Sequence, residues 1–392
     1  MGQSRFASSE FSHIAHSYKK MQQLIESAKS NPSATVASCV LGGALSYGVY
    51  RTVRKFLKKD EIVVTHLRVF PVKSCGGFDV QEWLINEYGL AYDRTWMIIR
   101  EKDNKFVTQR EKPQMVFIKT SILLDSNKAA KLTLNYPNTS PITVEYVEHV
   151  TVNDNNSSII RENVTIWGDK VSGLDCGDAV AKWLSNIIGE PVRLVQTINK
   201  VTDARTSPAT PIKHHVRPGE PEFIQPFSEK PIVDNTGFAD GYPMLLSNEA
   251  SVRDFNNKVI EDQSNLATGI FKKALYNLFG MYTFIDHWNF RSNIIVSSDG
   301  IAPYAEEKFR EIQINGMTFY GVKRCTRCTM PSVDTKKGVK RSFITDSLNK
   351  HRHCDIAGGT VFGMNLCHHP QNIGAKLKVG QLVTLKEVAF VK

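Results

Sequence analysis

The chain has 392 residues, 41% hydrophobic and 22% charged, which is typical of a folded globular protein and excludes a disordered or low-complexity chain. This length exceeds one average domain and indicates two folded units and a tail. The formal net charge is +10, but residues 1–60 hold nine Lys/Arg and three Asp/Glu (+6), so the rest carries only +4 (10 − 6 = 4). This distribution argues against a nucleic-acid-binding surface on the folded part.

Near the N-terminus, Ser30–Tyr50 is a stretch of 21 residues without a charged side chain. As a helix it spans roughly 31 Å, about one bilayer core. Five basic residues follow directly: Arg51, Arg54, Lys55, Lys58 and Lys59. Because flanking positive charge stays on the cytosolic side, the sequence predicts a membrane anchor at about 30–50 with the C-terminal bulk in the cytosol. A cleaved presequence and a buried helix are the alternatives.

The next hundred residues have the pattern of β-structure. We expect a hairpin formed by Arg94–Arg100 and Phe106–Arg110 around the polar turn at Glu101–Lys105. Further strands are expected at Ile62–Val72, Met115–Leu124, Lys131–Tyr136, Ile142–Val147 and Asn163–Trp167.

A helix is expected next, capped by Asp175 and ended by Gly189 and Pro191. Its apolar stripe is Val180, Trp183, Leu184, Ile187 and Ile188. Beyond it, a proline-rich stretch at 208–231 predicts a long irregular loop. Strands are expected at Val192–Gln196, Met244–Leu246, Asn293–Ser297, Ile312–Ile314, Met317–Tyr320 and Leu382–Val391, with Asn315-Gly316 as a hairpin turn. Many short strands with one or two helices favour β-barrels over a doubly wound sheet.

Four segments combine a cationic side chain with hydroxyl, amide or thiol groups. They are Val72–Gly77, Asp93–Trp96, Asn289–Asn293 and Cys325–Thr329. Lys73, Arg94 and Arg291 can converge on an anion such as phosphate, with Ser74 and Thr326 as neutral donors. Cys328 follows Arg327, and a neighbouring cation favours the thiolate that a soft metal needs. Taken singly, each such pair is more often a structural ion pair.

The seven cysteines, at positions 39, 75, 176, 325, 328, 354 and 367, are odd in number and scattered. This spacing is not that of a disulfide framework, so we expect reduced thiols that face the cytosol. Cys325, Cys328, Cys354 and Cys367, with four nearby histidines, could instead hold zinc or an iron–sulfur cluster. A structural zinc site usually shows a second tight cysteine pair, which is missing here.

At these residues the sequence resembles the MOSC-domain family, and specifically its mitochondrial amidoxime-reducing branch. The resemblance runs from about residue 62 to the C-terminus. It includes the segments FPVKSCGG, DRTWMII, WGDKVSGLDCGDAVAKWL, SNEASVRDFN, NFRSNIIV and CTRCTMPSVDTKKG. Their order along the chain is much more specific than any one of them.

The resemblance implies a mostly β (α+β) fold with three parts. They are an N-terminal segment with the anchor (1–60), a MOSC N-terminal β-barrel domain (61–190) and a MOSC domain (191–392). It also implies a molybdenum-molybdopterin cofactor, with Cys328 as the catalytic residue and molybdenum ligand. The residues expected to bind the cofactor are Lys73, Ser74, Arg94, Tyr242, Arg291, Thr326, Arg327 and Asn365.

Two departures from the family pattern stand out. Gly241 and Tyr242 occupy positions where relatives carry small hydroxyl residues, so no hydroxyl contact is expected at Gly241. The segment from about 260 to 287 is longer than in relatives, and FKKALYNLFGMYTFI within it has helical apolar spacing. An additional helix packed on the core and a helix that docks on a membrane or partner are the two interpretations.

The expected activity is reduction of N-hydroxylated compounds such as amidoximes and hydroxylamines. Because no flavin or nicotinamide motif is present, electrons are expected from cytochrome b5 and NADH-cytochrome b5 reductase, as the resemblance implies. The anchor and the resemblance favour the mitochondrial outer membrane, with the peroxisome or endoplasmic reticulum as alternatives. A molybdenum-cofactor carrier without reductase activity, and a structural zinc protein, are the competing hypotheses.

Overall fold

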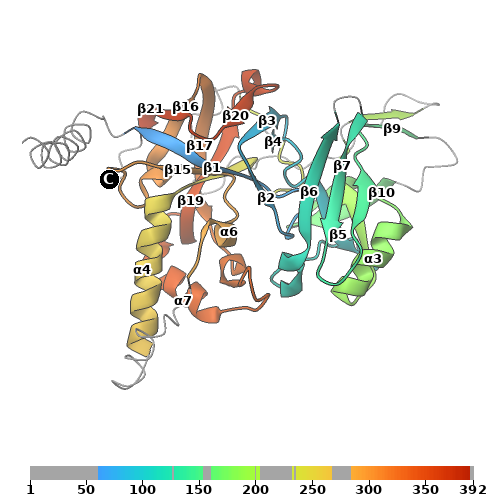
Figure 1. Ribbon diagram of the computed structural model, residues 1–392, viewed down its shortest axis with the longest axis horizontal. Coiled ribbons are helices and arrows are strands. Elements are labelled where there is room, and N and C mark those ends of the chain that lie inside the picture. Colours follow the sequence, from blue (N-terminus) through green and yellow to red (C-terminus); the bar gives the residue numbers. More distant parts are fainter. Residues whose placement is uncertain are drawn as a thin grey trace, which may run out of the picture. The chain divides into compact units, whose positions relative to one another are not determined.

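The computed structural model describes residues 61–125, 128–152, 160–198, 200–203, 232–233, 235–266 and 284–388 (Figure 1). Residues 62–392 form one compact unit. The anchor predicted at 30–50 and the proline-rich stretch at 208–231 lie outside the described residues. Within the described part, no helix combines the length and the apolar character that crossing a membrane requires.

Seven strands close into a barrel because β14 pairs with both β15 and β19. In spatial order they are β14 (Met244–Asn248), β15 (Ile294–Ser297), β1 (Ile62–Val69), β21 (Leu382–Val388), β16 (Phe309–Ile314), β17 (Met317–Thr326) and β19 (Gly359–His368). Two short strands extend this sheet, β2 (Phe78–Val80) on β1 and β18 (His353–Cys354) on β19. Closure leaves these strands no long free edge.

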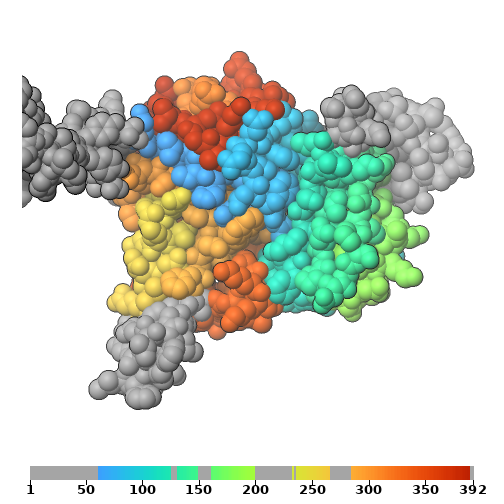
Figure 2. All heavy atoms as spheres, in the orientation of Figure 1, coloured from blue at the N-terminus to red at the C-terminus, as the bar shows by residue number. Residues whose placement is uncertain are grey.

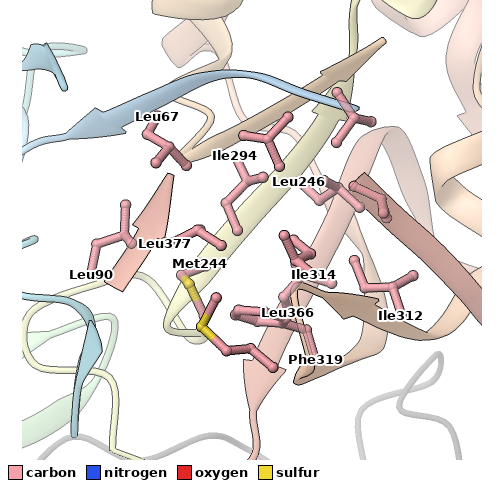
Figure 3. Close-up of a cluster of buried hydrophobic side chains, with 14 of the residues drawn as sticks. Leu67, Leu90, Met244, Leu246, Ile294, Ile312, Ile314, Phe319, Leu366 and Leu377 are labelled. Carbon is pink, nitrogen blue, oxygen red and sulfur yellow. The ribbon is translucent and has the colours of Figure 1, made fainter. Parts of the chain in front are cut away.

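The barrel interior is filled by apolar side chains that alternate along its strands. Figure 3 shows Leu67, Ile294, Leu246 and Leu366 pointing toward one another from four different strands. Phe319, Ile312 and Ile314 close the cluster from β16 and β17. This interior is a packed core rather than a channel, so a ligand site has to lie outside it.

The two ends of unit 62–392 are interleaved in space. β1 pairs with β21 near the C-terminus, and β20 (Lys376–Lys378) pairs with β3 (Glu82–Asn86), which also pairs with β4 (Gly89–Leu90). Figure 2 shows atoms of the early strands in blue directly against C-terminal atoms in red. The first strands of the sequence therefore complete the barrel built by the last ones.

A second group of strands has its own apolar core, which includes Trp96, Val107, Leu132, Leu184 and Leu194. A four-stranded sheet has the order β10 (Ile160–Ile166), β11 (Asp169–Asp175), β12 (Val192–Gln196) and β5 (Trp96–Arg100). The other sheets are β6 (Lys119–Asp125), β7 (Lys128–Asn135) and β8 (Ile142–Glu145), and the parallel pair β9 (His149–Val152) and β13 (Lys200–Asp203). Helix α3 (Asp178–Ile188) buries Val180, Leu184 and Ile188 against this core.

Helices cover one side of the barrel, where α4 (Glu249–Leu266) lies beside α7 (Ser342–Arg352) in Figure 1. Asp262 on α4 accepts hydrogen bonds from Ser347 (2.6 Å) and Lys350 (2.6 Å) on α7. The short helix α6 (His287–Phe290) contributes Phe290 to the core between them. The 3-10 turns are Pro113–Phe117, Ala305–Lys308, Met330–Ser332 and Pro370–Asn372.

The prediction of a mostly β chain with closed-barrel architecture is confirmed, and several elements agree closely. The strand at Val192–Gln196 has the predicted bounds. Asn315-Gly316 forms the hairpin turn between β16 and β17, with left-handed φ values of 49° and 80°. Gly189 ends α3 in the left-handed conformation, as expected of a C-terminal glycine.

Other local predictions are wrong. Met115–Phe117 belongs to a 3-10 turn rather than a strand, and Phe106 forms only an isolated bridge to Ile99. Asp175 does not cap α3, whose N-cap is Gly177: its carboxylate accepts from Arg193, from Arg161 and from the backbone N–H of Gly177, but not from the first turn of the helix. Helices α4 and α7 were not predicted. Of the segment 260–287, residues 267–283 lie outside the described residues.

Glu306 places a carboxyl group in the interior, on the turn that precedes β16. Its side chain is fully buried, and Oε2 accepts a hydrogen bond from Ser251 Oγ at 2.8 Å. Oε1 has no hydrogen-bond partner among the described residues. Burial, and then the neighbouring Glu307, raise the pKa of Glu306 to about 7. Its ionised form is therefore disfavoured in the folded protein.

Glu306→Gln is expected to change how the free energy of unfolding depends on pH. Between about pH 4.5 and 7 the unfolded chain loses the Glu306 proton while the folded chain keeps it, so the wild type loses roughly 3 kcal/mol as pH rises. The glutamine variant lacks this loss and should be more stable than wild type at pH 8 but not at pH 4.5. Urea unfolding of both proteins across this range measures the difference. If the free energies of unfolding of the two proteins changed with pH in parallel, the raised pKa of Glu306 would be contradicted.

Candidate functional site

All nine predicted site residues line one cavity of about 560 Å³. This volume lies within the range usual for small-molecule and cofactor sites. The nine residues are Lys73, Ser74, Arg94, Tyr242, Arg291, Thr326, Arg327, Cys328 and Asn365. They come from loops at the ends of β1 and β17, from the segments before β5 and β14, from the end of α6 and from β19.

Lys73 and Ser74 lie in the loop that follows β1. A bridge between Val72 and Trp96 fixes this loop, and Ser74 has a left-handed φ of 65°. Lys73 Nζ donates to the carbonyl of Phe238 at 2.9 Å and to the carboxylate of Asp240. Burial lowers the pKa of Lys73, although Asp240 acts in the opposite direction. The lysine is therefore held in place by protein acceptors.

Arg94 and Arg291 lie against the same aromatic ring. Their guanidinium carbons are 4.6 Å and 4.3 Å from the centroid of Phe70. Arg94 pairs with the buried carboxylate of Asp93, and its Nη2 donates to the carbonyl of Arg291 at 3.1 Å. Two like charges are thereby held close together, which favours an anion as their shared ligand.

Arg291 ends α6 in the left-handed conformation, with φ 58°. The start of this helix is fixed by a capping box, in which Asp286 accepts from the backbone of Trp288 and Asn289. Arg291 Nη1 donates to the carbonyl of Cys75 at 2.6 Å, whereas its Nη2 is buried without a hydrogen-bond partner among the described residues. Burial, and then Arg94, lower the pKa of Arg291 to about 9. An anion in the cavity would stabilise the charged form of Arg291, which burial and Arg94 disfavour.

Left-handed backbone is uncommon for residues other than glycine, and here Ser74, Arg94 and Arg291 all adopt it. Such conformations persist where the surrounding structure over-determines them, and they concentrate at functional sites. Each of the three follows a strand or helix and turns its side chain toward the cavity. The local backbone is therefore organised around this site.

Asn293 is a buried polar residue that sequence reasoning left without a role. Its Oδ1 accepts from Arg94 Nη1 and from the backbone N–H of Leu245, both at 3.1 Å. Its Nδ2 donates to the carbonyl of Arg68 at 3.1 Å. Asn293 thus fixes the Arg94 guanidinium to β1 and β14. The NFRSN motif contained it, but the sequence gives no sign of these non-local partners.

The loop after β17, residues 327–333, carries Cys328 and is called the thiol loop here. Cys328 is exposed on it as a free thiol, and the backbone N–H of Met330 points to its sulfur at 3.4 Å. Asn289 on α6 holds the loop by donating to the carbonyls of Pro331 (3.2 Å) and Val333 (2.9 Å). The sulfur of Cys328 is thus displayed on the cavity wall from a loop with fixed backbone contacts.

The hydrogen bonds of Arg327 go to groups other than the Cys328 sulfur. Arg327 Nη1 donates to the sulfur of Cys325 at 3.0 Å, and Nη2 donates to the carbonyl of Phe290 at 2.8 Å. Sequence adjacency suggested the other cysteine, but neighbours along an extended strand or turn point in different directions. Arg327 therefore joins the thiol loop to α6 and contacts the cysteine that is not the predicted ligand.

The remaining predicted residues complete the cavity wall. Tyr242 carries a buried hydroxyl without a hydrogen-bond partner among the described residues, and burial raises its pKa. Asn365 on β19 lies opposite Leu245 of β14, and Thr326 at the end of β17 pairs with Val361. Gly241 lines the cavity, and no heavy atom lies within 4 Å of the position that a Cβ would take there, so this position offers space rather than a contact.

The cavity is strongly cationic. Six basic side chains line it against one acid, Asp240, a net of +5 (6 − 1). Sequence reasoning missed two of these cations, Arg110 and Lys323, since neither stands in a distinctive motif. Five donors along the wall are buried and lack a hydrogen-bond partner among the described residues: Ser74 Oγ, Arg110 Nε, Tyr242 Oη, Arg291 Nη2 and Arg327 Nε. Unpaired buried donors are rare, and their convergence indicates an anionic ligand.

The zinc alternative finds no support in this arrangement. Over the ranges that the structure describes, no group of three or more His, Cys, Asp or Glu side chains is placed to hold a metal ion. Cys367 is buried, and Cys354 lies beside α7 on the short strand β18. The site has one exposed thiol on a cationic wall instead of a four-ligand cage.

The fold and the site together define a β-barrel protein with an anion-binding cavity and a free cysteine on its wall. Comparison with known families agrees: residues 61–191 match the MOSC N-terminal beta barrel domain, and residues 234–384 match the MOSC domain. The chain therefore belongs to the MOSC-domain family, as its sequence motifs predicted.

Similar proteins within the family fall into two groups. The chain is 28% identical over 323 residues to molybdenum cofactor sulfurase of Danio rerio, covering 81% of this chain and 33% of that protein. It is 28% identical over 335 residues to mitochondrial amidoxime-reducing component 1 of Homo sapiens, covering 84% of this chain and 83% of that protein. The match to the Mus musculus form covers 76% of this chain and 74% of that protein at 28% identity. The chain thus spans about a third of the length of the sulfurases it matches.

Proposed function

We propose that this protein is a molybdenum-cofactor-dependent reductase of N-hydroxylated compounds. The observation that carries the proposal is one cavity that brings the free thiol of Cys328 together with cationic donors that lack a hydrogen-bond partner among the described residues. An amidoxime or hydroxylamine would take up two electrons and two protons, exchanging its N–OH bond for N–H and releasing water. The similarity to mitochondrial amidoxime-reducing component 1 over most of both chains supports this reaction class.

The residues of the cavity fit a molybdenum-molybdopterin cofactor, which the MOSC match and both groups of relatives also support. Its phosphate would accept from Arg291, Arg94 and Ser74. Its metal is soft enough to take the thiolate of Cys328 as a protein ligand. When bound, the cofactor supplies two-electron redox chemistry at the metal.

The protein's own contribution is position and charge. The cradle of Lys73, Arg94 and Arg291 is fixed by protein acceptors before any ligand arrives, so binding costs little reorganisation. Cys328 lines the cavity and is exposed, so a small substrate could reach its sulfur from solvent.

Electrons have to come from a partner, because the sequence contains no flavin or nicotinamide motif. We propose cytochrome b5, reduced by NADH-cytochrome b5 reductase, as the donor. An anchor at about 30–50 in the mitochondrial outer membrane, with the cavity on the cytosolic side, would raise the effective concentration of such membrane-bound donors.

A second candidate is a carrier of the molybdenum cofactor, or the cofactor-binding part of a sulfurase system. The observation that favours it is the similarity to sulfurases of which this chain spans about a third. This candidate needs the same cradle but no electron partner and no substrate.

The deciding experiment uses the full-length chain, purified from a host that synthesises the cofactor. We expect molybdenum near one atom per chain, and benzamidoxime reduction to benzamidine with NADH, cytochrome b5 and its reductase. The same chain from a host unable to make the cofactor is the control and should be inactive. Molybdenum without turnover would favour the carrier, whereas zinc as the only metal would overturn both proposals.

A further inference from the structure

One wall of the cavity contains none of the predicted cofactor-binding residues. It consists of Trp167, Phe106 and Arg110. Trp167 is 43% exposed although its indole is large and apolar. Phe106 packs beside it, with ring centroids 5.4 Å apart, and the Arg110 guanidinium lies 4.5 Å from the indole centroid. The wall therefore offers the cavity an open aromatic surface next to a positive charge.

This wall is connected to the cationic cradle. Trp167 Nε1 donates to Asp240 Oδ1 at 2.8 Å, and the same carboxylate accepts from Lys73. Asp240 therefore holds the indole in a fixed orientation relative to Lys73. Any group held by the cradle and any group that packs on Trp167 share one cavity.

Arg110 differs from the other arginines of the cavity. Arg94 pairs with Asp93, Arg291 donates to Cys75, and Arg327 donates to Cys325 and Phe290. Arg110 makes no side-chain hydrogen bond or ion pair with any described residue, and its one contact of note is the ring of Trp167. Its guanidinium keeps its capacity to bind a carboxylate through paired N–H donors.

The backbone at Trp167 supports a role in binding. Trp167-Gly168 is the two-residue turn between β10 and β11, with left-handed φ values of 48° and 96°. Such turns favour Asn-Gly, and this chain uses Asn315-Gly316 in the equivalent turn between β16 and β17, away from the cavity. A bulky side chain in this conformation is an outlier, which local turn preference does not explain.

We propose that Trp167 and Arg110 select the substrate: they favour N-hydroxylated compounds that carry an aromatic ring and a carboxylate. The ring packs on the exposed indole, and the carboxylate binds Arg110, while the N–OH group points toward the cradle and Cys328. This inference rests on the proposed reductase function for its reaction, but the binding preference can be measured without turnover.

The kinetic test compares benzamidoxime with 4-carboxybenzamidoxime in the reconstituted electron-transfer chain. Wild type should prefer the carboxylate, and Arg110→Met should lower kcat/KM for it about 10- to 100-fold, while benzamidoxime changes less than about threefold. Molybdenum per chain should stay at the wild-type value. An equal loss on both substrates, or a loss of molybdenum, would place Arg110 in the cofactor cradle and overturn the proposal.

The binding test uses calorimetry on the molybdenum-loaded protein without electron donors, so it is decisive even if wild type reduces neither compound. Wild type should bind 4-carboxybenzamidoxime at least about tenfold more tightly than benzamidoxime, and Arg110→Met should abolish this difference. Trp167→Asn, which restores the residue favoured at this turn, should weaken binding of both compounds without lowering the melting temperature. Equal affinities in wild type would refute the selection, whatever the outcome for turnover.

Discussion

Cys328→Ala is expected to lower benzamidoxime turnover at least ~100-fold in the reconstituted chain with NADH, cytochrome b5 and its reductase. The sulfur is the exposed soft ligand on the cationic wall, and alanine leaves that coordination position to water. The fold should be unaffected, because Cys328 is exposed and its sulfur accepts a hydrogen bond only from the backbone of Met330 among the described residues. Turnover, molybdenum per chain and thermal melting would be measured on the same preparations.

Cys354→Ala is the matched control for this experiment. Cys354 is also outside any disulfide, but it lies on β18 beside α7 and does not line the cavity. It should keep turnover within about twofold of wild type. Wild-type turnover in the Cys328 variant, with molybdenum still bound, would show that the metal needs no thiolate from this residue.

Arg291→Met is expected to have opposite effects on cofactor binding and on stability. Arg291 is a buried cation, and its Nη2 has no hydrogen-bond partner among the residues that the structure describes. Burial, and then Arg94, lower its pKa to about 9. Removing it should lower molybdenum and pterin content at least about tenfold, because a charge-assisted contact to the phosphate is lost. The cofactor-free protein should unfold at the same denaturant concentration or be stabilised by about 1–2 kcal/mol, since a buried charge is relieved.

Arg253→Met serves as the control for loss of a positive charge. Arg253 is largely exposed on α4 and pairs with Glu249 one helical turn earlier. The cofactor content should not change, and the free energy of unfolding should stay within about 0.5 kcal/mol of wild type. If Arg291→Met destabilises the cofactor-free protein by several kcal/mol, Arg291 is chiefly a structural residue. Its assignment to the cofactor-binding cradle would then be contradicted.

Much of the fold followed from local patterns. The local residue pattern predicted β12 with its observed bounds and the C-terminal parts of β10 and β16, because strand and face are encoded in neighbouring residues. The Asn-Gly dipeptide predicted a turn because few residues tolerate two consecutive left-handed positions. Where tertiary contacts override local preference, prediction failed. Asp175 had the pattern of a helix cap, but its carboxylate is bound by Arg193 and Arg161 from neighbouring strands.

The candidate site divides in the same way. The motifs contain seven of the nine predicted residues, because a cation next to a hydroxyl, amide or thiol is visible in sequence, whereas Tyr242 and Asn365 came from the family resemblance. The structure places all nine on one cavity. Arg110, Trp167 and Asn293 were not recognised. Their roles depend on partners far away in the chain: Asn293 contacts Arg68, and Trp167 contacts Asp240.

By itself, the sequence determined the family, the mostly β composition and the chemical inventory of the site, because these are properties of residue types and their local order. Only the tertiary structure decided which groups meet. It closes the barrel by pairing β14 with β19 and directs Arg327 to Cys325 rather than Cys328. It also sets Arg110 against Trp167, with no ion-pair partner in the part of the chain that the structure describes. These contacts join residues from separate strands and loops, and local preference carries no information about distant partners.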